Sequence, residues 1–195
     1  MIDEVEDEEP MPPHMADELY GEFYTAVAYY DDVKCIEILQ KGPLFINVSE
    51  AKDMFLIKSC RNGKIRAARF LIEKGADANA TDDGLAVLSS TAAAGQLDAV
   101  RLLLEHGADP NRTRCLITTV NGSGVGEHRE AILKLLLEKG ANPNLVFAMF
   151  GDKSNARTVL DFASSDSPVR KILLEHGAKT AAEILKENPN AEIVD

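Results

Sequence analysis

The sequence predicts an all-α solenoid, in which similar helix-turn-helix units stack side by side in a row. A leucine-rich segment that ends in glycine recurs five times, and these glycines stand 33, 32, 33 and 37 residues apart. A near-constant spacing of this size is typical of a stacked repeat array. In the most regular copies the apolar residues before the glycine follow a single helical stripe, as at Ile65, Ala68, Leu71 and Ile72. The recurring glycines are Gly42, Gly75, Gly107, Gly140 and Gly177.

Each unit is expected to contain two helices and a polar finger. The longer, outer helix ends at the recurring glycine, since a left-handed residue terminates many helices, and a Lys or His before it suits the negative end of the helix dipole. The shorter, inner helix is rich in small residues, which let two helices approach closely. We expect inner helices at 21–30, 54–63, 86–95, 116–120 and 158–165. No unit buries its apolar face until a neighbour stacks on it.

These units resemble the ankyrin repeat, whose period is about 33 residues. Gly-Ala-Asp/Asn-x-Asn recurs at 75–79, 107–111 and 140–144, and residues 158–163 match the TPLHxA signature with Val for Pro and Asp for His. The resemblance covers about 20–180 and implies an ankyrin-repeat solenoid with finger loops. We expect a disordered acidic tail at 1–16, repeats at about 18–47, 48–79, 80–111, 112–144 and 145–180, a closing helix at 179–187 and a C-terminal tail at 188–195.

The charge balance limits the partners that this protein can bind. The 195 residues include 21 Lys and Arg against 32 Asp and Glu, for a formal net charge of -11. Nucleic acids and anionic membrane surfaces would repel such a chain. We therefore expect a partner protein of basic character, no nucleic acid, no membrane, and a monomer when the protein is alone.

The cysteines indicate a reducing compartment. Cys35, Cys60 and Cys115 are odd in number and lack CxxC spacing, so they build neither a disulfide framework nor a zinc site. No segment approaches the roughly 18 apolar residues of a membrane span. We expect a cytoplasmic protein without a cofactor.

The residues that could carry catalysis are scattered. His106 and His176 precede helix-ending glycines, where a helix cap is the simpler interpretation. The turn 122–126 is glycine-rich, as phosphate-binding loops are, but it follows an expected helix instead of a strand, and no Lys-Ser/Thr pair follows it. A flexible insertion is therefore favoured there. We expect no enzyme, and keep a nucleotide- or anion-binding enzyme using this turn as the weakest alternative.

The resemblance to ankyrin repeats implies that partners bind the concave face, the surface made by the finger tips and the ends of the inner helices. Tyr and Arg are enriched at binding hot spots, and both occur at these positions. The candidate partner-binding residues are Tyr29, Tyr30, Arg61, Asn62, Asp82, Asp83, Leu85, Arg112 and Arg114.

The long finger at 145–157 has two possible roles. Its apolar side chains either fold back as a lid over the groove between repeats four and five, or form an exposed patch for a partner. We favour the partner, which adds Phe147, Met149 and Phe150 to the candidate site.

The resulting functional prediction is a non-catalytic protein-protein interaction module, either an adaptor or a scaffold. The alternative is a stoichiometric inhibitor, such as a toxin-neutralising immunity protein, whose acidic surface covers the basic site of an enzyme. Charge alone does not choose between the two.

Overall fold

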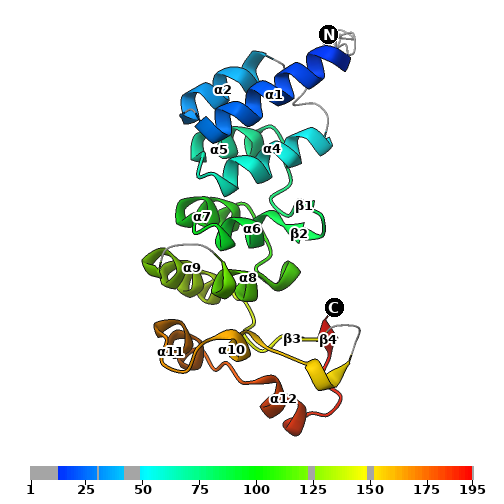
Figure 1. Cartoon of the computed structure of the whole chain (residues 1–195), viewed down its shortest axis with the longest axis vertical. Coiled ribbons are helices and arrows are strands. Elements are labelled where there is room, and N and C mark those ends of the chain that lie inside the picture. The colour runs from blue at the N-terminus through cyan, green and yellow to red at the C-terminus, as the bar shows by residue number, and fades with distance from the viewer. Residues whose placement is uncertain (1–12, 30, 42–48, 123–125, 149–151, 195) are drawn as a thin grey trace, which may run out of the picture.

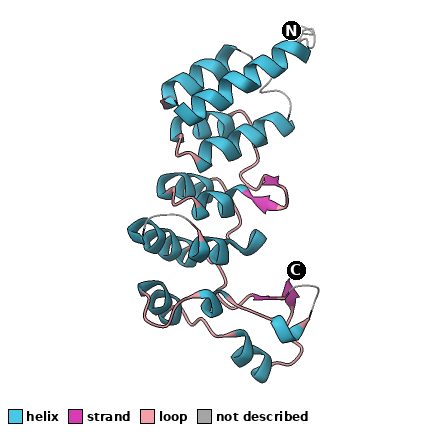
Figure 2. Cartoon of the chain, in the orientation of Figure 1, coloured by secondary structure: helices cyan, strands magenta, loops and turns pink. Residues whose placement is uncertain are grey.

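The computed structural model describes residues 13–29, 31–41, 49–122, 126–148 and 152–194. Its helices form pairs that stack along one axis (Figure 1). The inner helices of successive pairs contact one another, and so do the outer helices. The short strands lie on the side of the inner helices, away from the outer helices (Figure 2). The predicted α-helical solenoid is confirmed.

Five helix pairs are present in the described part of the chain. The inner helices are α1 (Pro13–Tyr29), α4 (Ser49–Arg61), α6 (Val87–Ala93), α8 (Cys115–Asn121) and α10 (Val159–Phe162). The outer helices are α2 (Asp32–Lys41), α5 (Ile65–Glu73), α7 (Leu97–Glu105), α9 (Gly126–Glu138) and α11 (Pro168–Glu175). The other elements are β1 (Thr81–Asp82), β2 (Leu85–Ala86), η1 (Arg112–Arg114), β3 (Val146–Phe147), η3 (Lys153–Asn155), α12 (Ala181–Glu187) and β4 (Ile193–Val194).

The core is built from equivalent leucines of the outer helices. Leu71, Leu103, Leu136 and Leu173 each lie four residues before a recurring glycine, and all four are fully buried. Burying one such side chain contributes about 1.5–3 kcal/mol to folding. The predicted apolar stripe is thereby confirmed.

The recurring glycines end the outer helices as expected. Gly75, Gly107, Gly140 and Gly177 have φ between 75° and 89°, a region that L side chains avoid. After Gly107, the backbone N–H of Ala108 donates to the carbonyl of Leu103 at 3.0 Å, the closing bond of a Schellman motif. The ring Nδ1 of His106 lies 2.9 Å from the carbonyl oxygen of Leu102, which confirms the cap interpretation of this histidine.

Asparagines tie each repeat to the next. Nδ2 of Asn111 donates to the carbonyl of Gly140 at 3.0 Å, and its Oδ1 accepts the backbone N–H of Asn142 at 2.7 Å. Asn79 and Asn144 make the same pair of bonds one repeat earlier and one repeat later. Each amide thus satisfies backbone groups that the neighbouring helix end leaves open.

Several helix boundaries differ from the prediction; α4, for example, begins at Ser49 instead of residue 54. The first helix begins at Pro13, inside the segment expected as a tail, since proline is well tolerated where its missing N–H has no helical partner; residues 1–12 lie outside the described residues. The helix α10 ends at Phe162, short of the expected 165, because Ala163 is extended. Arg170 then donates to the carbonyls of Leu160 and Ala163.

Within the C-terminal segment 188–195, which was expected to be a tail, Ile193 and Val194 instead pair with the long finger. These residues form β4, which pairs in parallel with β3, so that Val146 faces Ile193 in the register. The closing helix α12 precedes this strand and begins with a capping box between Thr180 and Glu183.

Candidate partner-binding surface

The first described finger is a β-hairpin that presents two carboxylates. Strands β1 and β2 pair antiparallel, with Asp82 opposite Leu85. Asp83 and Gly84 both have positive φ, at 49° and 75°, as two-residue hairpin turns require. Asp82 and Asp83 are exposed, whereas Leu85 is half-buried. The hairpin therefore holds its two charges at the tip.

The second finger, η1, is held in an unusual conformation that presents two arginines. Thr113 and Arg114 are both left-handed, with φ of 55° and 53°, which costs roughly 1–2 kcal/mol per residue outside glycine. Oγ of the buried Ser89 lies 3.0 Å from the carbonyl oxygen of Thr113 and 2.9 Å from its Oγ1. The backbone N–H of Ala86 donates to the same Oγ1 at 3.0 Å. These bonds hold the finger, and Arg112 and Arg114 stay exposed.

Residues 145–148 of the third, long finger fold back as a lid. Our preference for an exposed patch is wrong for this part of the finger. Val146, Phe147 and Ala148 are all buried. Side chains alternate along a strand, so Val146 and Ala148 pack in a satellite core with residues of α12 and β4, while Phe147 joins the main core. Met149 and Phe150 lie outside the described residues.

The first repeat contributes tyrosines to the same surface. Tyr29 is 83% exposed, whereas Tyr30 lies outside the described residues. The ring of Tyr24 lies 5.2 Å from Nζ of Lys58, a cation–π distance. Burial and then the negative charge of Asp82 raise the pKa of Tyr24. Lys58 was not among the candidate residues. It stands three residues before Arg61 in the same helix, and this spacing, which places both side chains on one helix face, could have indicated it.

Arg61 is the last residue of α4 and Asn62 follows it; both are exposed. The side-chain amide of Asn62 donates to the carbonyl of Lys58 at 2.9 Å and so caps the helix. Within the described residues, Arg61 has no carboxylate within ion-pair distance, and the same holds for Arg112. The two arginines are thus available to a partner, whereas Asn62 has a structural role.

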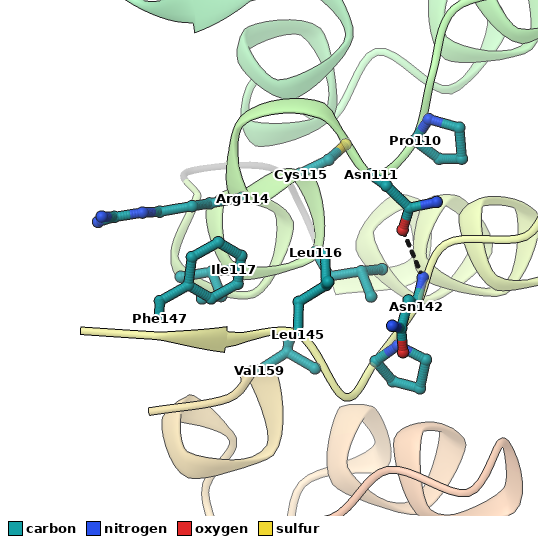
Figure 3. Close-up of a pocket in the computed structure, with 11 residues that line it drawn as sticks. Pro110, Asn111, Arg114, Cys115, Leu116, Ile117, Asn142, Leu145, Phe147 and Val159 are labelled. Carbon is teal, nitrogen blue, oxygen red and sulfur yellow. Dashed lines mark hydrogen bonds between the residues drawn. The ribbon is translucent and has the colours of Figure 1, made fainter. Parts of the chain in front are cut away.

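A groove of about 200 Å³ lies between repeats four and five. Arg114 stacks on Phe147 at 5.3 Å from the ring centroid, and Figure 3 shows the side chains of Arg114, Phe147 and Ile117 grouped at one side of the view. Of this lining, only Arg114 and Phe147 were candidate residues from the sequence. Arg157, for example, reaches the site through its antiparallel bridge with Phe147, which no local sequence pattern indicates. The lining residues are Arg114, Ile117, Phe147, Ala148, Asn155, Arg157 and Phe162.

A second, narrower pocket on the other side of Phe147 has no room for a ligand. Its free volume is about 10 Å³, at most enough for one water molecule. Figure 3 shows that it is crossed by the hydrogen bond from the backbone N–H of Asn142 to Asn111. The residues around this pocket therefore form the packed junction between repeats four and five.

The groups that carry chemistry elsewhere in the molecule have structural explanations. A Cβ on Gly122 would collide with the carbonyl oxygen of Ala93, so close packing on α6 requires this glycine; residues 123–125 of the glycine-rich turn lie outside the described residues. Burial raises the pKa of Cys60 and of Cys115 to about 12.

In the described ranges, no three His, Cys, Asp or Glu side chains gather as metal ligands, and no helix has the length and apolar character to cross a membrane.

The stacked helix pairs and their fingers define an α-helical repeat protein of the solenoid class. Residues 23–114 match the sequence family described as ankyrin repeats, in three copies. Residues 23–114 thus consist of ankyrin repeats, and the helix pairs α8–α9 and α10–α11 continue the same array beyond the matched residues. No curated protein matches the chain. Ankyrin repeats are generally protein-protein interaction modules and are typically non-catalytic.

Proposed function

We propose that this protein is a non-catalytic module that holds a partner protein on its concave face. The observation that carries the proposal is that the backbone of the fingers is held by hydrogen bonds while the charged side chains at their tips are exposed. The hairpin β1–β2 and the finger η1 are held by backbone pairing and by Ser89, yet Asp83 and Arg112 at their tips are exposed. Preorganised side chains of this kind bind without a large loss of conformational entropy.

The charges on the fingers are arranged by sign. The finger of repeat three carries Asp82 and Asp83, whereas the finger of repeat four carries Arg112 and Arg114. Complementary potentials guide a partner into one orientation and exclude others. We therefore refine the expected basic partner to one with a basic region facing the Asp82 finger and an acidic region facing Arg112 and Arg114.

A pull-down with paired charge variants tests the proposal. The concave variant carries R61E, D82K and R112E; the convex control carries R69E, R101E and E105K, at exposed positions of the outer helices α5 and α7. Both variants change the net charge by the same amount. Specific partners should be retained by the wild type and the convex control and lost from the concave variant. Loss from the convex control alone would place the interface on the outer helices.

The inhibitor alternative is supported by the acidic hairpin. Asp82 and Asp83 project from a rigid, short turn, as groups that enter a basic enzyme site must. If the captured partner is an enzyme, D82K should relieve its inhibition and leave the stability of the repeat array unchanged. An adaptor would instead leave the partner's activity unaffected.

We also propose that the protein works in a reducing compartment such as the cytoplasm. Cys35, Cys60 and Cys115 are free and buried, and buried thiols serve packing as small apolar groups. Fractionation of the source cells, followed by mass spectrometry of the thiols, tests this; a disulfide at any of the three would count against it.

A further inference from the structure

We propose that the groove between repeats four and five, which we call the arginine groove (Arg114, Ile117, Phe147, Ala148, Asn155, Arg157 and Phe162), binds an acidic segment of the partner. An apolar side chain of that segment lies on the floor, and flanking carboxylates bind the guanidinium groups of Arg114 and Arg157. The inference rests on the proposed function, because the groove belongs to the concave face.

Both arginines are positioned before any ligand arrives. The guanidinium of Arg114 is stacked on Phe147, and its backbone is held by the left-handed turn of η1. Arg157 exchanges two backbone hydrogen bonds of 2.8 Å with Phe147, and its Nη1 donates to the carbonyl of Ala156. A guanidinium has five N–H donors, so most of those on both side chains remain for a ligand.

The groove keeps a positive character in an acidic molecule. Among the described residues, neither Arg114 nor Arg157 has a carboxylate within ion-pair distance. The nearby Asp152 accepts hydrogen bonds from Ser154, which lower the pKa of its carboxyl. Asp161 caps α10 and accepts the backbone N–H of Ala181. The local carboxylates therefore hold backbone turns, and a carboxylate from outside can bind two guanidinium groups that have no carboxylate partner among the described residues.

The floor is apolar and suits a side chain. Ile117 and Phe147 are each 8% exposed, whereas Phe162 at the edge is 41% exposed. The volume of about 200 Å³ is below the roughly 300–1,000 Å³ of pockets for cofactors and drug-sized ligands. A single leucine or phenylalanine side chain fits such a space.

Carboxylates match these arginines better than a nucleic acid does. A planar guanidinium binds a carboxylate through two parallel hydrogen bonds, and stacking on an aromatic ring leaves its donor edges free for that purpose. Any anion meets the repulsion of a molecule with a net charge of -11, but a nucleic acid carries one negative charge per nucleotide and is repelled more strongly than a short peptide with a few carboxylates. The groove thus favours a short peptide in which acidic residues stand on both sides of a bulky apolar residue.

Selection from a random twelve-residue peptide display library on the full chain tests the proposal. Enriched peptides, synthesised with a fluorescent label, are measured by anisotropy against wild type and R114E/R157E. We expect Leu, Ile or Phe flanked by Asp or Glu, and an affinity loss of about 100-fold or more in the double variant, because two charge-assisted contacts are lost. The matched control R69E/R101E changes the net charge equally on the outer helices and should bind within about threefold of wild type.

A second variant separates binding from folding. Arg114→Gly removes the guanidinium, and glycine accepts the positive φ of this position without strain. We expect it to keep or raise the melting temperature while it weakens the acidic peptides about tenfold or more.

Three results would overturn the proposal: enriched peptides without acidic residues, equal binding by R114E/R157E, or tighter binding of a twelve-nucleotide DNA strand than of the peptides. The outcome is separable from that of the proposed function. A partner that is lost from the concave variant but kept by R114E/R157E would leave the concave face as the interface and remove the arginine groove from it.

Discussion

The buried thiols of Cys60 and Cys115 show how strongly packing controls a single side chain. Burial raises the pKa of each from 9.0 to about 12, because the thiolate is desolvated. At pH 8 only about one thiol in ten thousand is ionised at such a value, and the thiolate is the reactive form. We expect Cys60 and Cys115 to resist iodoacetamide in the native protein and to react readily in urea, as mass spectrometry of the alkylated peptides would show.

The same two pKa values predict a loss of stability in alkaline solution. Since the folded state holds its thiol protons up to higher pH than the unfolded chain, the contribution is complete below pH 9.0 and declines as the pH rises towards about 12. Urea unfolding between pH 8 and 10.5 should therefore show a falling free energy of unfolding. The double variant C60A/C115A should show a weaker pH dependence, and an unchanged slope would refute the assignment to these thiols.

At the scale of one element, the finger η1 depends on a side chain of the preceding repeat. Ser89→Ala removes the hydroxyl that contacts the carbonyl and Oγ1 of the half-buried Thr113, so that the carbonyl loses this hydrogen bond and Oγ1 keeps only the N–H of Ala86. We expect a loss of about 1–3 kcal/mol in the free energy of unfolding, measured by urea denaturation, and weaker binding of peptides that need Arg114.

Ser90→Ala is the control for this prediction. The hydroxyl of Ser90 donates to Val87 within its own helix and does not reach the finger. This variant should lose less than half as much stability and keep peptide binding. Equal effects of the two substitutions would show that α6 alone, and not the finger, is affected.

The lid over repeat five depends on β4. Ile193→Asp places a carboxylate where Ile193 packs against the satellite core of Val146 and Ala148. We expect a lower melting temperature by calorimetry and faster hydrogen exchange at the amides of residues 146–148, because a carboxylate at this half-buried position loses the apolar packing of Ile193 and part of its own hydration. The exposed neighbour supplies the control Glu192→Gln, which should leave both measurements unchanged.

The elements that the sequence predicted well are those specified by nearby residues. The outer helices follow from an apolar stripe and a terminal glycine, both local signals, so Leu103 and Gly107 were assigned correctly. The long finger was not, because Phe147 is buried by contacts with η1 and α8, and β3 is completed by a strand at the far end of the chain. The arginine groove was missed for the same reason, since Arg114 and Arg157 meet only through tertiary pairing.

At the scale of the whole molecule, the described part of the chain is a row of repeats whose helices pack mainly on those of the adjacent repeats. Stability in such an array is approximately a sum of repeat terms and interface terms, so the ends open more easily than the centre. Repeat five is the end unit of the array in the described residues, and its inner helix spans only Val159–Phe162. The lid, α12 and β4 form a satellite core beside it.

This one-dimensional arrangement predicts different outcomes for the same substitution at two equivalent leucines. Leu103 and Leu173 are both fully buried, four residues before a recurring glycine. Removal of either side chain to Ala leaves a cavity that costs about 2–5 kcal/mol. Because Leu173 lies in the end unit, L173A should let α10, α11 and the lid open locally, whereas L103A weakens the centre, on which the repeats of both sides stack.

Hydrogen exchange with mass spectrometry distinguishes the two cases. For L173A we expect faster exchange confined to residues 146–187, while the amides of α6 and α7 keep their wild-type protection. For L103A protection should fall in all the central repeats, because opening there breaks the interfaces on both sides. Uniform loss of protection in L173A would show instead that the array unfolds as one cooperative unit, in which case the arginine groove would be as stable as the centre of the solenoid.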